Sequence, residues 1–151
     1  MRQFSGGGGG GGGVTLANDG NNRVTTATGS DSLNGEANLT FDGSVLTISG
    51  AQLVNRVSKA TADSPYSVAA TDYYIGCTTD GAITINLPAV ATAGTGRVLI
   101  IKDEAGTGAG TNSITLDGAS TETIDGSQTQ VISTDFASVT LVCNGTSWSI
   151  V

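Results

Sequence analysis

Runs in which apolar and polar residues alternate fill the chain from residue 66 onward. Ile83, Ile85 and Leu87 share one face of such a run, and Trp148 and Ile150 share one face of another, because successive side chains of a β-strand point to opposite sides. These runs predict short strands over residues 66–69, 73–77, 82–87, 97–102, 113–116, 121–124, 130–133, 138–143 and 147–151. Their regular spacing is typical of a sandwich, jelly roll or barrel.

Residues 98–101 are apolar at every position. A strand that is apolar on both faces is central in a sheet or lies beneath a contact between subunits. The glycine-rich segment 106–110 follows and resembles a dinucleotide-binding loop, but such a loop needs a helix after it to hold the pyrophosphate. Residues 111–116 have the pattern of another strand instead, so we expect a long hairpin loop there.

Glycine-containing turn signals recur along the chain. Asp42-Gly43, Asp80-Gly81 and Asn144-Gly145 are each followed within a few residues by an apolar–Thr–apolar or apolar–Ser–apolar triplet. An Asp-Gly or Asn-Gly pair before a strand pattern favours a hairpin turn. We interpret the recurrence as a hairpin rule rather than as a solenoid repeat.

The segment from residue 14 to residue 50 has sparse apolar residues and further turn signals at Asp19-Gly20 and Asn34-Gly35. Residues 46–48 alternate as a strand, and the mixed pattern over 51–64 favours an extended strand because it is rich in β-branched, Ser and Thr residues. A segment this short and sparse cannot build a hydrophobic core by itself. It therefore needs the C-terminal domain or other copies of the chain.

An unbroken glycine run covers residues 6–13. Such a run is a flexible tether on its own, and it reaches roughly 27 Å at about 3.4 Å per residue. We predict that this arm docks on a partner, with Arg2, Phe4, Gly6 and Gly13 as candidate docking residues. The predicted organisation is a Gly-rich arm over 1–13, an extended, intertwined stalk region over 14–64, and a β-sandwich-like or jelly-roll-like domain over 65–151.

Composition favours an all-β fold. The chain has 23 glycines, 5% aromatic residues and 13% charged residues. This composition is poor in the residue types that form helices. The formal net charge is -7, and no Lys or Arg follows Lys102. Because an acidic surface repels phosphate, we expect no direct nucleic-acid binding and interpret the acidic half as a solvated face.

Nucleophilic and zinc chemistry find no support. The chain has no histidine, so a Ser-His-Asp or Cys-His site is impossible within one chain. Cys77 and Cys143 alone cannot hold zinc, and we expect buried thiols rather than a disulfide in a protein folded in a cytoplasm.

Carboxylate chemistry is equally weak. Asp103 and Glu104 are adjacent and would point to opposite faces of a strand. Asp117 and Asp125 each precede a glycine, so we expect solvated turn residues rather than calcium ligands. The sequence predicts a protein that is not an enzyme and has no cofactor or metal.

No apolar stretch is long enough to span a membrane, and residues 1–4 lead straight into glycines without a secretory signal. We therefore expect no membrane partner and synthesis in a cytoplasm. Tyr66, Tyr73, Tyr74 and Trp148 are candidates for stacking on a glycan, although scarce aromatics in a small β domain more often anchor its core. Tyr73 is the expected exposed exception.

Two parts of the chain resemble bacteriophage virion proteins. Residues 36–48, which read Glu-Ala-Asn-Leu-Thr-Phe-Asp-Gly-Ser-Val-Leu-Thr-Ile, are similar to a stalk element common in phage tail-fibre and related virion proteins. The C-terminal half resembles the terminal β domain of the same proteins. Its matching pieces are residues 85–88, 100–104, 113–118, 123–126 and 138–142, with Asn144-Gly145 and Trp148.

The resemblance implies a homotrimeric, non-enzymatic component of the virion surface, made in the cytoplasm of a bacterial host. Its implied partners are itself and the major capsid protein or another virion protein. The chain departs from the tail-fibre pattern because it is short and its glycine arm replaces a long adaptor. This favours a capsid decoration (cement) or head-fibre protein that docks through its N-terminal part. The alternative is a tail-fibre module that recognises host surface glycans.

The trimer interface is predicted in the stalk region. Leu39, Phe41, Leu46 and Ile48 lack enough apolar partners within that segment, and burying each is worth roughly 1.5–3 kcal/mol. Association around an axis supplies partners from the other copies. Glycines permit the close approach of chains at such an axis.

Overall fold

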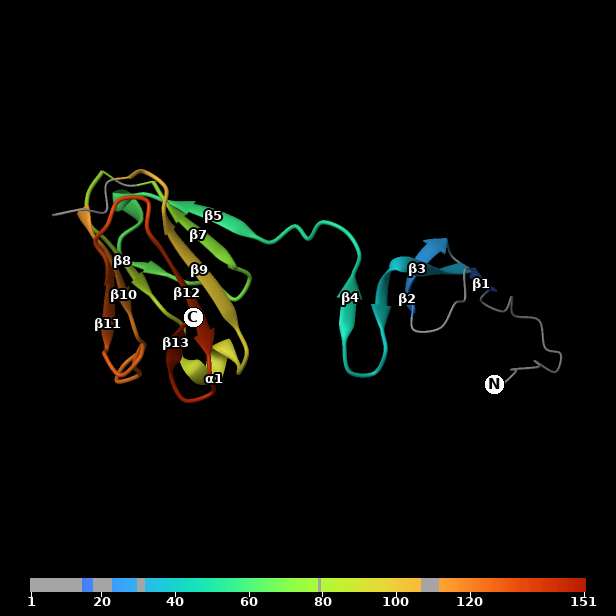
Figure 1. The fold of residues 1–151 in the computed structure, drawn as a ribbon. Coiled ribbons are helices and arrows are strands. Elements are labelled where there is room, and N and C mark those ends of the chain that lie inside the picture. Colours follow the sequence, from blue (N-terminus) through green and yellow to red (C-terminus); the bar gives the residue numbers. More distant parts are fainter. Residues whose placement is uncertain (1–14, 18–22, 30–31, 79, 107–111) are drawn as a thin grey trace. The chain divides into compact units, whose positions relative to one another are not determined.

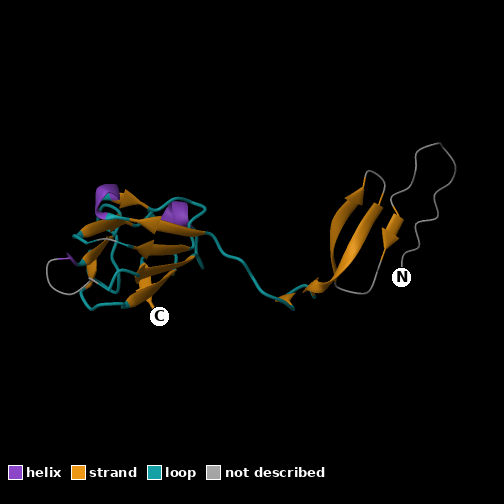
Figure 2. Ribbon diagram, turned by 90° about the horizontal axis from the view of Figure 1, so that it is seen from above, coloured by secondary structure: helices purple, strands orange, loops and turns teal. Residues whose placement is uncertain are grey.

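The computed structural model describes residues 15–17, 23–29, 32–78, 80–106 and 112–151. The chain divides into two compact units, Met1–Leu53 and Val54–Val151. The prediction of an all-β fold is confirmed, because strands dominate the described parts of both units (Figure 2). The helical elements are short, namely η1 (Thr61–Asp63) and α1 (Val90–Ala93).

The N-terminal unit is built around one long strand, β3 (Ser32–Phe41). β1 (Thr15–Ala17) pairs with it in parallel, and β2 (Arg23–Gly29) and β4 (Leu46–Ile48) pair with it antiparallel. Asn34-Gly35, which the sequence marked as a turn, lies within β3 opposite Thr25 and Thr26, so that prediction is wrong. Cross-strand pairing has overridden the local preference of this dipeptide for a turn. Asp19-Gly20 lies outside the described residues.

Two sheets make up the C-terminal unit (Figure 1). The five-stranded sheet has the order β13-β12-β9-β7-β5, with the bounds β5 (Arg56–Lys59), β7 (Tyr74–Cys77), β9 (Val98–Asp103), β12 (Ser138–Cys143) and β13 (Trp148–Ile150). The four-stranded sheet has the order β11-β10-β8-β6, with the bounds β6 (Tyr66–Ser67), β8 (Ile83–Asn86), β10 (Ile114–Asp117) and β11 (Thr129–Ile132). β5 belongs to this unit, although its residues fall in the range 14–64 that the sequence assigned to the stalk.

The chain passes back and forth between the two sheets and so winds around the core. From β5 to β10 successive strands alternate between the sheets, and each pairs in parallel with the next strand but one. Only then do β11, β12 and β13 add antiparallel pairs. The pairing winds like a solenoid, although the recurring turn signals were interpreted as a hairpin rule. That rule is confirmed for Asp42-Gly43 and Asn144-Gly145 and is wrong for Asp80-Gly81, which lies between strands of different sheets. A jelly roll, which is antiparallel, differs from this pairing. The predicted hairpin between residues 101 and 114 is wrong for the same reason, because β9 and β10 lie in different sheets.

Side chains that point inward from both sheets form one buried core. Ile83, Ile114 and Ile132 lie opposite one another across β8, β10 and β11, and Leu99 lies opposite Leu141 across β9 and β12. All five are at most 3% exposed. Stacking of like aliphatic residues between neighbouring strands gives the unit its hydrophobic stability, at roughly 1.5–3 kcal/mol for each large side chain.

The predicted strands of this unit are confirmed apart from 121–124. There the chain turns, since the amide of Glu122 donates to the carbonyl of Ala119 at 2.9 Å and Ser120 has a positive φ of 55°. Gly118 permits this turn, because a Cβ at that position would lie 2.3 Å from the carbonyl oxygen of Glu122. Ile124 makes isolated bridges with Ser127 and Trp148.

Two buried carboxylates fix loops against this core. Asp103 is 1% exposed and accepts hydrogen bonds from the amides of Ala105, Gly106 and Phe136 at 3.0–3.1 Å. Asp72 is 3% exposed and accepts the hydroxyl of Tyr66 at 2.6 Å. Protein hydrogen-bond donors thus take the place of water around each carboxylate. A buried charge needs such donors to avoid a large desolvation free energy.

Ionisation of the Tyr66 phenol is expected to lower the stability of this unit at alkaline pH. Burial, followed by the hydrogen bond to Asp72, raises the pKa of Tyr66 from 10.0 to about 12. The folded state favours the neutral phenol, so this contribution is complete below pH 10 and is lost as the pH rises from about 10 to about 12. We expect the urea midpoint of the wild-type protein to fall more steeply over this range than that of Tyr66→Phe. Parallel declines in the two proteins would contradict the assignment.

Candidate oligomerisation interface

The hairpin of β3 and β4 presents a continuous apolar face. Leu39 lies opposite Ile48, and Phe41 lies opposite Leu46. Directly opposed residues of an antiparallel pair project to the same side, and residues two apart in a strand share a face. The four side chains predicted to form an interface are therefore brought together, and we call them the hairpin apolar face. Thr40 and Thr47 form the opposite, polar side of the same hairpin.

This face is open to solvent in the single chain. Phe41 is 49% exposed, Leu46 57% and Ile48 44%, while Leu39 is partly buried. A folded chain normally exposes large apolar side chains singly, whereas a contiguous group marks a contact site. The arrangement can bind an apolar surface of similar size.

Asp42 fixes the turn that joins the two strands. Its Oδ1 accepts the amide of Ser44 at 2.9 Å and the amide of Val45 at 2.8 Å. The Val45 amide, followed by the Ser44 amide, lowers the pKa of Asp42 because both donors favour the charged carboxylate. Gly43 has a φ of +101°, a conformation that side chains rarely adopt. This turn sets the register that places Phe41 opposite Leu46.

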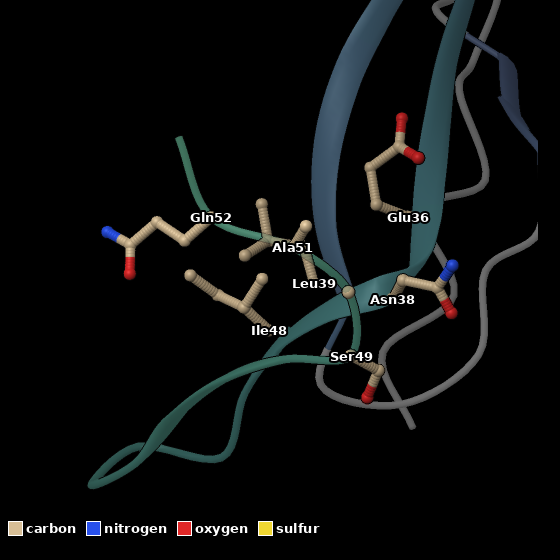
Figure 3. A pocket seen from close by; sticks show the side chains of 8 residues that line it. Glu36, Asn38, Leu39, Ile48, Ser49, Ala51 and Gln52 are labelled. Carbon is tan, nitrogen blue, oxygen red and sulfur yellow. The ribbon is translucent and has the colours of Figure 1, made fainter. Parts of the chain in front are cut away.

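An open groove of about 460 Å³ adjoins the hairpin apolar face. Figure 3 shows Leu39, Ile48 and Ala51 gathered on one side of it, with Glu36 and Asn38 on the other. The groove thus continues the apolar surface and gives it a polar border. A docked partner would meet both kinds of surface, as at the core and rim of protein interfaces.

The carboxylate of Glu36 lies on this polar border. Glu36 accepts hydrogen bonds from the hydroxyl of Thr26 and from the side-chain amide of Asn34, the latter at 3.2 Å. These two bonds, the Thr26 bond first, lower the pKa of Glu36, so the group remains charged at neutral pH.

Two further exposed apolar side chains were not singled out from the sequence. Val45 is 57% exposed in the turn, and Leu53 is 97% exposed at the end of the unit. The sequence signal for both is weak, because Val45 directly precedes the alternating triplet and Leu53 lies in the ambiguous stretch 51–64. The predicted docking residues Arg2, Phe4, Gly6 and Gly13 lie outside the described residues.

The other candidates from the sequence occupy structural positions. Cys77 and Cys143 are free and buried, and burial raises the pKa of the Cys77 thiol to about 12. Trp148 is fully buried, while Tyr66, Tyr73 and Tyr74 are partly buried, so Tyr73 does not stand out as the exposed exception. A thiol that resists ionisation is a poor nucleophile.

The carboxylates are likewise tied to the fold. Glu104 pairs with Arg56 and accepts the hydroxyl of Tyr74 at 3.0 Å. Asp125 accepts the amide of Ile150 at 3.3 Å rather than standing free in its turn. Within the described ranges, no group of three or more Cys, Asp or Glu side chains is placed to hold a metal ion.

Comparison of the chain with protein-family models gave no match, and neither did comparison with curated proteins. Among the residues that the structure describes, no helix is both long enough and apolar enough to cross a bilayer.

Proposed function

We propose that this chain is a non-enzymatic structural protein of a bacteriophage particle, which forms a homotrimer and decorates the capsid surface as a cement or head-fibre protein. The observation that carries the trimer is the hairpin apolar face, whose Phe41, Leu46 and Ile48 are between 44% and 57% exposed in the single chain. The virion assignment rests on the resemblance of residues 36–48 and of the C-terminal half to phage fibre proteins.

Three copies around an axis would bury this face without any other partner. Each hairpin would contribute the same four side chains, and a closed ring leaves no unpaired copy. The polar side of the hairpin, Thr40 and Thr47, would then face solvent. The Gly-rich arm would attach the trimer to the major capsid protein, and the acidic C-terminal unit would extend into solvent and keep the particle soluble.

Removing the apolar side chains of the hairpin tests the trimer. We expect Phe41→Ser combined with Leu46→Ser to lower the mass in solution toward that of the single chain. Two lost contacts of about 1.5–3 kcal/mol each correspond to at least about a hundredfold weaker association, since about 1.4 kcal/mol is tenfold.

Thr40→Ser combined with Thr47→Ser is the matched control, because it changes the opposite side of the same two strands. Sedimentation velocity of both variants at micromolar concentration measures the effect. An unchanged mass for the Phe41/Leu46 variant, with its strand content intact by circular dichroism, would refute the interface.

The position of the protein on the particle tests the capsid assignment. Electron microscopy of the parent virion, with antibodies against the purified protein, should label the head at many sites. Label confined to the tail tip would replace this function with a receptor-binding one, and binding of the purified protein to host-surface glycans would then be expected.

Deletion of residues 6–13 tests the role of the arm. Because these residues carry no side chains that could hold the trimer, we expect the deleted protein to keep the wild-type mass in solution. Its binding to particles that lack the protein should weaken at least tenfold in a co-sedimentation assay. Undiminished binding of the deleted protein would rule out docking by the arm.

A further inference from the structure

The outer side of the five-stranded sheet carries an apolar patch. Val98 lies opposite Val142, and Ile100 lies between Tyr74 and Thr140 in the register of β7, β9 and β12. All five point away from the core, because their neighbours along each strand, such as Leu99 and Leu141, point into it. We call Tyr74, Val98, Ile100, Thr140 and Val142 the outer apolar patch.

The patch lies on the side of the sheet that faces away from the hydrophobic core. Tyr74, Val98, Ile100, Thr140 and Val142 are partly buried, whereas Leu99, Ile101 and Leu141 on the inner side are completely buried. The centre of β9 is thus apolar on both faces. A sheet face in water normally carries polar residues, so this composition calls for a contact.

The outer side of the four-stranded sheet is mostly polar, with Val131, 44% exposed and opposite Thr115, as an apolar exception. Thr84 lies opposite Thr115, and Asn86 lies opposite Asp117. Both sheets face the same core, so the contrast between their outer sides is not a consequence of packing within the chain. An apolar outer side is typical of a contact surface, whereas a polar outer side is typical of a surface in water.

Charges of both signs border the outer apolar patch. Arg56 on β5 pairs with Glu104, and its guanidinium lies 6.0 Å from the ring centroid of Tyr74. Lys102, two residues beyond Ile100 on the same side of β9, donates to the carbonyl of Phe136. By contrast, Asp117 lies on the outer side of the other sheet, and no Lys or Arg follows Lys102 in the sequence.

We infer that the outer apolar patch is a second contact between copies of this chain, separate from the hairpin apolar face. The charge distribution selects this occupant. Copies of a chain with a net charge of -7 repel one another, and the least repulsive approach places together the sides that carry Arg56 and Lys102. On this side Arg56 and Lys102 reduce the repulsion between two acidic copies around an apolar centre.

Cysteine cross-linking of the full chain tests this contact. Thr140→Cys places a thiol within the patch, and Thr115→Cys places one at the matching mid-strand position on the polar side of the other sheet. Both replacements are small and both sites are partly buried. The native Cys77 and Cys143 are both 0% exposed.

With a short bismaleimide at micromolar protein concentration, we expect a covalent dimer of Thr140→Cys severalfold more abundant than that of Thr115→Cys. Equal yields from the two sites, or no dimer from Thr140→Cys, would overturn the inference. These outcomes are independent of the hairpin. A multimeric mass without a Thr140→Cys cross-link removes only the second contact, and a cross-link that persists in the Phe41/Leu46 variant supports it even if the hairpin interface fails.

Discussion

The N-terminal unit has more large apolar side chains than its described strands can cover. Phe41, Leu46 and Ile48 lie on one side of the sheet formed by β1–β4, and each is at least 44% exposed. The described part of this unit contains a single sheet, and the apolar face of a single sheet needs a second layer to cover it. This constraint underlies the proposed trimer, since another copy offers the same apolar face as a second layer.

The C-terminal unit meets the same requirement within one chain. Its two sheets cover each other, and the core includes fully buried residues from both, among them Ile75, Ile101, Ile85 and Leu116. The free edge of β13 is also covered, because Trp148 donates to the carbonyl of Thr123 at 2.9 Å and accepts from the amide of Asp125 at 3.0 Å. An edge covered in this way does not recruit further strands. The outer faces of the two sheets differ in polarity, and the inferred second contact uses the more apolar of the two.

The strands and the interface candidates could be predicted from local sequence patterns, because each depends on only a few neighbouring residues. Alternation with a period of two identified β8 and β12, and the Asp42-Gly43 turn between two alternating runs brought Phe41 opposite Leu46. The winding of the chain was not predictable in this way. The same alternation fits a hairpin partner and a parallel neighbour equally well, and the interval between paired residues changes from Val57–Ile75 to Ile75–Ile101, so no constant repeat appears in the sequence. The contrast between the two outer faces emerged only once the pairing was known.

The central claim is that the hairpin apolar face is covered by other copies of the same chain. The most direct test is the mass of the full-length wild-type protein in solution, measured by sedimentation equilibrium at micromolar concentration. The account predicts three times the chain mass of 14.9 kDa. A mass of 14.9 kDa across the concentration range, with the hairpin folded, would contradict it.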